Sequence, residues 1–167
     1  MTDWSLRPRA GYKGPGTVAW LRAQAIEVEP EPNRAFLQAD GTLVSMLSWS
    51  EALVLDAAAA DSCSARLAAA WSLDAATRCY AVPRRDSHYW IRICGAAAPE
   101  LFSTLCSVDL RPAAFLLHQV AQTLLAATNA IIIRDDLDAG VPAYHVLGDS
   151  ASAPYLWSTL SDAMQRT

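Results

Sequence analysis

Apolar and polar residues alternate along the chain with two different periods, and the period changes from segment to segment. A period of two predicts short strands over residues 33–38, 42–47, 52–55, 78–82, 88–94 and 143–147. A period near 3.6 predicts helices over residues 17–27, 61–73, 99–106 and 150–164. Asp40-Gly41 joins the first two strands and is the strongest hairpin signal in the chain. We therefore expect an α+β fold in which mainly antiparallel strands pack against about four helices.

Residues with short polar side chains stand where these helices begin. Thr17 is the expected N-cap of the first helix, Asp61 or Ser62 that of the second, and Ser150 or Ser152 that of the last. Residues 1–16 are rich in glycine and proline, which predicts an extended lead-in before a single domain over residues 17–167.

The aromatic and sulfur-containing side chains of the helices are expected in the core. Trp20 and Trp71 lie on the apolar faces of the first two helices, and Trp157 and Met164 on that of the last. Trp49 lies in a predicted turn, where an exposed tryptophan is typical of a protein interface.

The segment between residues 113 and 134 fits two patterns. Its leucines follow a helical period from Ala113 to Leu125, and alanine favours helices. A strand over residues 119–126 followed by a second strand over residues 130–134 is the alternative. Asn129 then marks a tight turn at Thr128-Asn129, and Ile131-Ile-Ile133 is β-branched.

Composition narrows the class of protein. The 167 residues suit one domain, and a net charge of −4 argues against nucleic acid or an anionic membrane as the main partner. Residues 112–133 carry no Asp, Glu, Lys or Arg, but His118, Gln119, Gln122 and Asn129 interrupt them, so we expect no membrane span.

The chain has four cysteines, and no two of them form a Cys-x-x-Cys pair: Cys63, Cys79, Cys94 and Cys106. Their spacing predicts free thiols and no metal site. The first residues show no secretory signal, and we expect a reducing cytoplasm.

The strongest candidate for chemistry is Arg84-Arg85-Asp86-Ser87-His88, between two predicted strands. Arg84 and Arg85 suit a carboxylate or phosphate, and His88 suits proton transfer near neutral pH. The structural alternative is a charged hairpin tip in which Asp86 begins an Asx-turn. No catalytic residue is predicted.

Other polar residues favour structural roles. Lys13-Gly-Pro-Gly16 resembles an anion-binding loop but lacks the phosphate-loop spacing, so it is interpreted as a helix entry. Asp109 and Arg111 are expected to form a salt bridge that shapes the fold. His118 and His145 are expected as core histidines that donate to backbone carbonyls.

An acidic segment follows the possible strand over residues 130–134. Asp135, Asp136 and Asp138 with Gly140 are interpreted as a solvated loop, because the spacing of a calcium loop is absent.

Three blocks, in this order, resemble the gamma subunit of heterotetrameric sarcosine oxidase, a branch of the folate-binding fold shared with the glycine-cleavage aminomethyltransferase. They are Cys106-Ser-Val-Asp-Leu-Arg-Pro112, Ala121-Gln-Thr-Leu-Leu-Ala126 and Tyr155-Leu-Trp157 with Leu160-Ser-Asp-Ala163. The similarity extends weakly through Arg34-Ala35 and residues 43–56. It implies a single folate-binding-type domain, and it favours the two strands over the helix for residues 119–134.

The resemblance also implies a function: an accessory noncatalytic subunit that assembles with alpha, beta and delta-type subunits in an oxidase that demethylates sarcosine. Such a subunit holds no flavin, nicotinamide or zinc, so no cofactor is expected on this chain. The alternative is a stand-alone tetrahydrofolate-binding or aminomethyltransferase-like protein, with Arg84, Arg85, Asp86 and His88 as the site. A structural protein unrelated to methylamine metabolism is the third reading.

Two features depart from the family pattern. The first predicted helix follows Lys13-Gly-Pro-Gly16 where the family has a preceding strand. The Lys-Gly-Cys-Tyr signature of the folate-binding iron–sulfur repair branch is absent.

Overall fold

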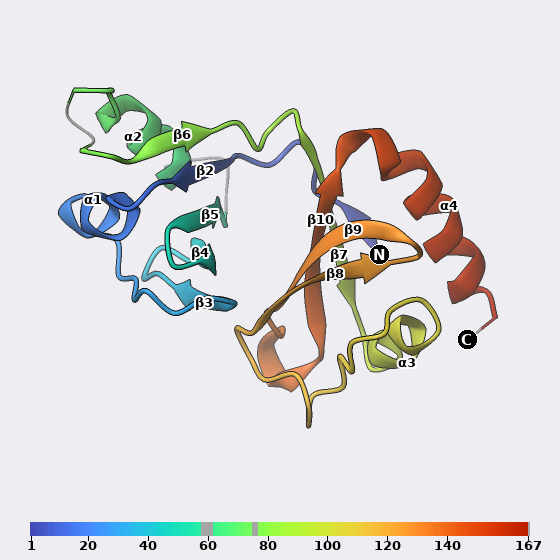
Figure 1. The fold of residues 1–167 in the computed structure, drawn as a ribbon. Coiled ribbons are helices and arrows are strands. Elements are labelled where there is room, and N and C mark those ends of the chain that lie inside the picture. Colours follow the sequence, from blue (N-terminus) through green and yellow to red (C-terminus); the bar gives the residue numbers. More distant parts are fainter. Residues whose placement is uncertain (58–61, 75–76, 167) are drawn as a thin grey trace. The chain divides into compact units, whose positions relative to one another are not determined.

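The structure is a computed structural model of residues 1–167, and it describes all of them except 58–61, 75–76 and 167 (Figure 1). Asp61, one of the two expected helix caps, lies outside the described residues. The chain forms two compact units, one made of Leu6–Arg85 and the other of Met1–Ser5 with Asp86–Thr167. We refer to them as the N-terminal unit and the C-terminal unit.

The N-terminal unit is an antiparallel sheet with two helices. Its strand order is β3-β4-β5-β2-β6. Its elements are β2 (Arg9–Lys13), α1 (Thr17–Ala23), β3 (Arg34–Leu37), β4 (Leu43–Ser48), β5 (Glu51–Leu55), α2 (Cys63–Ala70) and β6 (Tyr80–Val82). Tyr12, Trp20, Met46 and Leu67 belong to its core.

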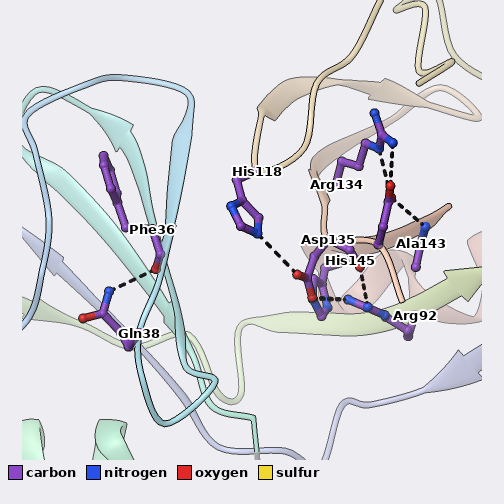
Figure 2. Close-up of polar contacts among 9 residues, drawn as sticks. Phe36, Gln38, Arg92, His118, Arg134, Asp135, Ala143 and His145 are labelled. Atoms are coloured by element: carbon purple, nitrogen blue, oxygen red, sulfur yellow. Dashed lines mark hydrogen bonds and ion pairs between the residues drawn. The ribbon is translucent and has the colours of Figure 1, made fainter. Parts of the chain in front are cut away.

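Side chains bond the backbone near the ends of some of these elements. The Ser62 hydroxyl accepts from the Ala65 N–H at 3.1 Å and caps α2, as expected. The Gln38 side chain donates from Nε2 to the carbonyls of Phe36 at 3.1 Å and of Glu27 at 2.9 Å, the first of which Figure 2 shows.

The C-terminal unit is a second antiparallel sheet in the order β1-β7-β10-β9-β8. Its elements are β1 (Thr2–Asp3), β7 (His88–Cys94), α3 (Ala98–Ser103), β8 (Val120–Leu125), β9 (Thr128–Arg134), β10 (Ala143–Asp149) and α4 (Ala153–Met164), with short 3-10 turns at Asp138–Gly140 and Ser150–Ser152. Strand alternation places Tyr89, Ile91, Tyr144 and Val146 in one core with Phe102 of α3.

The expected α+β architecture is confirmed: the described residues hold two antiparallel sheets and four α-helices. The strand alternative for residues 119–134 is also confirmed, as β8 and β9. The division into a lead-in and a single domain over 17–167 stays a prediction. Within the described part of the chain, no helix is long and apolar enough to cross a membrane.

Two local expectations about the first residues were wrong. A strand, β2, does precede the first helix, so this supposed departure from the family pattern disappears. Thr17 is the first residue of α1 rather than its cap, which is Gly16. Gly16 is required for packing, because a Cβ at this position would lie 1.9 Å from the Thr77 carbonyl oxygen.

The β8–β9 turn also differs from its prediction. It is made by Ala126 and Ala127, not by Thr128-Asn129, and both alanines have positive φ, 48° and 64°. Two positive φ values are typical of the type I′ turn, whose twist matches that of the strands. Strand pairing therefore overrides the preference of alanine for helical backbone.

The last helix buries a narrower face than expected. Leu156 and Leu160 are fully buried, whereas Trp157 and Met164 are exposed. In the N-terminal unit, the exposed Trp49 agrees with its prediction.

Candidate functional site

A cluster of charged and aromatic side chains lies on the face of the C-terminal sheet opposite its helix-covered core. Arg92 on β7 and His145 on β10 are directly paired across the strands. Asp135 follows the end of β9, and His118 precedes β8. Figure 2 shows both histidines and Arg92 directed at Asp135. We call Arg92, His118, Asp135 and His145 the Asp135 cluster.

The carboxylate of Asp135 is surrounded by donors. Arg92 Nη1 donates to Oδ2 at 3.0 Å, and Arg92 Nη2 donates to the Asp135 carbonyl at 2.6 Å. His145 Nε2 lies 3.1 Å from Oδ2, and His118 Nε2 lies 3.6 Å from Oδ1. Arg92 and His145 are only 5% exposed at their side chains. A buried guanidinium needs such a carboxylate, because an unpaired charge is costly away from water.

The two ring nitrogens of His145 have different partners. Trp90 Nε1 lies 2.9 Å from His145 Nδ1, and an indole N–H can only donate. Nδ1 therefore accepts from Trp90, and Nε2 is the ring nitrogen that faces both Asp135 and Arg92 Nη1. Trp4 packs against Trp90 and stacks over Arg92 at 5.3 Å, which further covers the cluster.

The cluster keeps Asp135 ionised. Burial alone raises the pKa of the Asp135 carboxyl, but the hydrogen bonds from His118 and His145 and the charge of Arg92 outweigh it and hold the pKa well below its ordinary value. A carboxylate held in this way is a poor proton acceptor near neutral pH. The geometry therefore supports a positioning role for Asp135 rather than acid–base catalysis.

A second charged pair lies next to it in the chain. Arg134 Nε donates to Asp136 Oδ1 at 2.9 Å, and Nη2 bonds Oδ2 of the same carboxylate. Nη1 donates to the carbonyls of Pro112 at 3.0 Å and Phe115 at 2.7 Å. One buried arginine thus fixes both its own loop and the segment that precedes β8.

A groove of about 770 Å³ lies at the other end of this sheet. Its lining residues are Ser87, His88, Ser107, Gln122, Thr123, Leu124, Asn129, Ala130, Ile131, Leu147, Gly148 and Asp149. The size is that of a small-molecule site. The lining offers a carboxylate, amides and hydroxyls.

The four residues predicted as an anion site fall in different environments. Arg84 and Arg85 belong to the N-terminal unit, and Asp86 and His88 to the C-terminal unit. The Arg84 guanidinium pairs with Glu51, which also binds Lys13 at 2.8 Å. Arg85 and Asp86 are exposed. The anion site itself stays a prediction.

His88 is the member of this set that lines the groove. Its Nδ1 lies 2.8 Å from the Ser87 hydroxyl. The backbone of the turn is held by Ser150, whose hydroxyl donates to the Asp86 carbonyl at 2.9 Å.

Sequence reasoning missed the Asp135 cluster. His118 and His145 both face Asp135, a pairing that their prediction as core histidines did not include. Asp135 and Asp136 are ion-paired, so the expected solvated loop was wrong for both. The sequence signal for this cluster was weak. An uncharged segment is followed by Arg134-Asp135-Asp136, and this pattern does not indicate which side chains on other strands these charges contact.

Two other expectations are settled by contacts. Asp109 and Arg111 do form a salt bridge, at 2.6 Å. Lys13-Gly-Pro-Gly16 is a helix entry, because the Gly14 and Gly16 N–H groups donate to the carbonyls of Ser50 and Arg78 at 2.8 and 3.1 Å. Those donors are therefore occupied by the protein itself.

These features define an α+β protein with two antiparallel sheets. One of the sheets carries a buried charged cluster and a groove. No protein-family model matches its sequence, and no curated protein matches it significantly.

Solved structures do match it in fold. A chain of the heterotetrameric sarcosine oxidase from Corynebacterium sp. U-96, in complex with pyrrole 2-carboxylate, is similar with a TM-score of 0.77 and 18% identity, over 98% of this chain and 82% of that one. Aminomethyltransferase T of the glycine cleavage system from Bartonella henselae matches with a TM-score of 0.65 and 15% identity, over 95% of this chain. This chain covers 44% of that one. The expected resemblance to this fold is confirmed.

Proposed function

We propose that this chain is an accessory, noncatalytic gamma-type subunit of a sarcosine oxidase-like complex. The observation that carries the proposal is the match to a chain of a heterotetrameric sarcosine oxidase over 98% of this chain and 82% of that one. The aminomethyltransferase extends far beyond the matched region, since only 44% of it is covered.

The Asp135 cluster supports the same proposal. Its carboxylate has its donors within the fold and a lowered pKa, which suits a side chain that positions loops. Exposed apolar side chains, among them Trp49 at 71%, suit a protein that docks onto others.

The test is co-production with the alpha, beta and delta-type subunits from the same organism, followed by purification through a tag on this chain. We expect a complex of fixed stoichiometry that oxidises sarcosine, while this chain alone has no activity and no flavin absorbance. Stoichiometric flavin on the isolated chain, or failure to join the complex, would contradict the proposal.

The second candidate is a stand-alone tetrahydrofolate-binding or aminomethyltransferase-like protein, which the groove beside His88 favours. Asp149 offers a carboxylate for a pterin-like ring, and the lining amides offer further bonds. Calorimetric titration of the isolated chain with tetrahydrofolate separates the two. Micromolar binding that Asp149→Asn abolishes, and that Asp162→Asn on α4 leaves intact, favours the second candidate.

A further inference from the structure

Two loops of the C-terminal unit expose large aliphatic side chains. The first, residues 111–119, carries Leu116 at 55% exposure and Leu117 at 44%. The second, residues 135–142, carries Leu137 at 46% and Val141 at 37%. We call residues 111–119 the leading loop and residues 135–142 the acidic loop.

The leading loop is held from inside the fold. Phe115 is buried in the core, and its carbonyl and that of Pro112 accept from Arg134. The Leu116 N–H donates to Gln119 Oε1 at 2.6 Å. The two exposed leucines are therefore carried on anchored backbone.

His118 ends the leading loop in an unusual backbone state. Its φ is 63°, in the left-handed region that a non-glycine residue rarely adopts. Its N–H donates to the Arg134 carbonyl at 2.9 Å, and its ring faces Asp135. Strain of this kind persists where surrounding contacts enforce it and is frequent at functional segments.

The acidic loop shares the same anchor. Asp135 and Asp136 begin it and are tied to Arg92 and Arg134. The Leu137 N–H donates to the Val141 carbonyl at 3.0 Å, which closes the loop. Both loops thus depend on one buried set of ion pairs at the end of β9.

We propose that the leading and acidic loops together form a docking surface for a partner polypeptide whose contact area is apolar and rimmed by arginine or lysine. Loops that are already ordered lose little conformational entropy on binding, so their apolar area contributes more fully to affinity. Exposed leucines would otherwise be a liability in water.

Charge decides the chemistry of the partner. The C-terminal unit has four arginines, and three of them are paired with carboxylates: Arg92 with Asp135, Arg111 with Asp109 and Arg134 with Asp136. It has nine acidic residues: Asp3, Asp86, Glu100, Asp109, Asp135, Asp136, Asp138, Asp149 and Asp162. Asp138 is exposed between Leu137 and Val141. A basic rim on the partner complements this excess.

The surface rests on the proposed function in one respect only: the expected partner is a larger oxidase-type subunit. The experiment is therefore made independent of that identity. A photoreactive phenylalanine analogue replaces Leu117 of the full chain in its native cell, and the crosslinked peptide is mapped by mass spectrometry. The same analogue in place of Ser158, exposed on α4, is the control.

We expect one discrete adduct from position 117, on an apolar segment flanked by Arg or Lys, and none from position 158. An oxidase subunit as partner supports both proposals, and another polypeptide with this chemistry supports the surface while contradicting the proposed function. A position-117 adduct no more frequent than the control, or one on lipid or on an acidic segment, overturns the surface.

Matched variants test the energetics. Leu116→Ser with Asp138→Lys should lower the adduct yield at least about tenfold, because a central apolar contact and a charge contact are both lost. Leu73→Ser, at a leucine of the N-terminal unit that is 67% exposed, should not change it. The melting temperature of each variant should stay within about 2 °C of the parent protein. A larger fall for Leu116→Ser would show that the loop packs within the chain, and would overturn the surface.

Discussion

The two units are built alike but treat buried charge differently. Each is a five-stranded antiparallel sheet with two α-helices among its described residues. In the N-terminal unit, buried Arg9 donates to the carbonyls of Arg7 and Arg84 at 3.0 Å, and buried Asp56 accepts from the Ser64 N–H at 3.0 Å and its hydroxyl at 2.8 Å.

In the C-terminal unit, buried arginines pair with carboxylates that stand in loops. The N-terminal unit also ties distant segments together: Arg9 on β2 bonds the carbonyl of Arg84, and Arg84 pairs with Glu51 on β5, with side chains 11% and 16% exposed. In the C-terminal unit two such pairs hold neighbouring residues of one loop, Asp135 and Asp136. The comparison teaches that both units use buried arginines to join distant segments, and that the C-terminal unit concentrates two of these ion pairs on a single loop.

The largest expected effect comes from Arg134→Met. It leaves the Asp136 carboxylate, only 12% exposed, without its partner, and it frees two loop carbonyls. We expect a loss of about 3–5 kcal/mol in the free energy of unfolding, measured by urea titration.

The matched variant in the N-terminal unit is Arg84→Met. The pair is nearly as buried as Arg134–Asp136, with side chains 11% and 16% exposed, but Glu51 would keep its bond to Lys13, so the loss should be smaller, about 1–2 kcal/mol. Equal losses for the two variants would break the contrast between the units.

Asp135→Asn should cost about 2–3 kcal/mol at pH 7, since charge-assisted bonds to Arg92 and His145 are weakened. The pKa of this carboxyl is lower in the folded protein than in the unfolded chain. Its contribution is therefore fully present above the unfolded pKa, about 3.9, and is lost as pH falls below it.

The difference in unfolding free energy between the parent protein and Asp135→Asn should thus shrink from pH 5 towards pH 3, as followed by urea titration at each pH. Asp136→Asn, which keeps the amide near Arg134, controls for a general loss of charge. If the difference in unfolding free energy did not change with pH, Asp135 would not contribute to the loss of stability in acid.

Replacing Ala126-Ala127 by Asn-Gly should stabilise the protein by about 1–2 kcal/mol. Both alanines have positive φ, which is unfavourable for them and favourable for Asn-Gly in a type I′ turn. Thermal unfolding measures the gain. A loss of stability would mean that the alanine methyl groups contribute packing that outweighs the strain.

The smallest of the four effects is Ser62→Ala in the N-terminal unit. It removes the cap of α2 and the hydrogen bond from the Ser62 hydroxyl to Asp56, and should cost about 1 kcal/mol, again by thermal unfolding. Ser62→Thr, which keeps a hydroxyl for the Ala65 N–H and for Asp56, should restore most of the loss.

Local patterns predicted most of the fold. The spacing of Tyr89, Ile91 and Ile93 predicts a strand, which β7 forms over the expected residues His88–Cys94, and Ser62 caps its helix as expected. Both depend on interactions within a few residues, which sequence spacing records. The helical period of residues 113–125, by contrast, gave the wrong element, because the pairing of β8 with β9 outweighs the propensity of the separate segment.

The candidate site was less accessible from sequence. His145 and Arg92 are 53 positions apart and face each other only because β7 and β10 pair antiparallel in one register. A shift of one residue would turn each side chain to the other face of the sheet. Arg84 pairs with Glu51 on β5, a contact across 33 positions that the adjacency of Arg84 and Arg85 in sequence does not record.

The sequence by itself determined the α+β class, the positions of most strands and helices, and the blocks that resemble the sarcosine oxidase fold, because periodicity, caps and turns are local. The tertiary structure alone decided which charges meet, that Asp135 is enclosed by two histidines and an arginine, and that the leucines of two loops face water. These depend on strand register and on burial, which arise only when distant segments pack together.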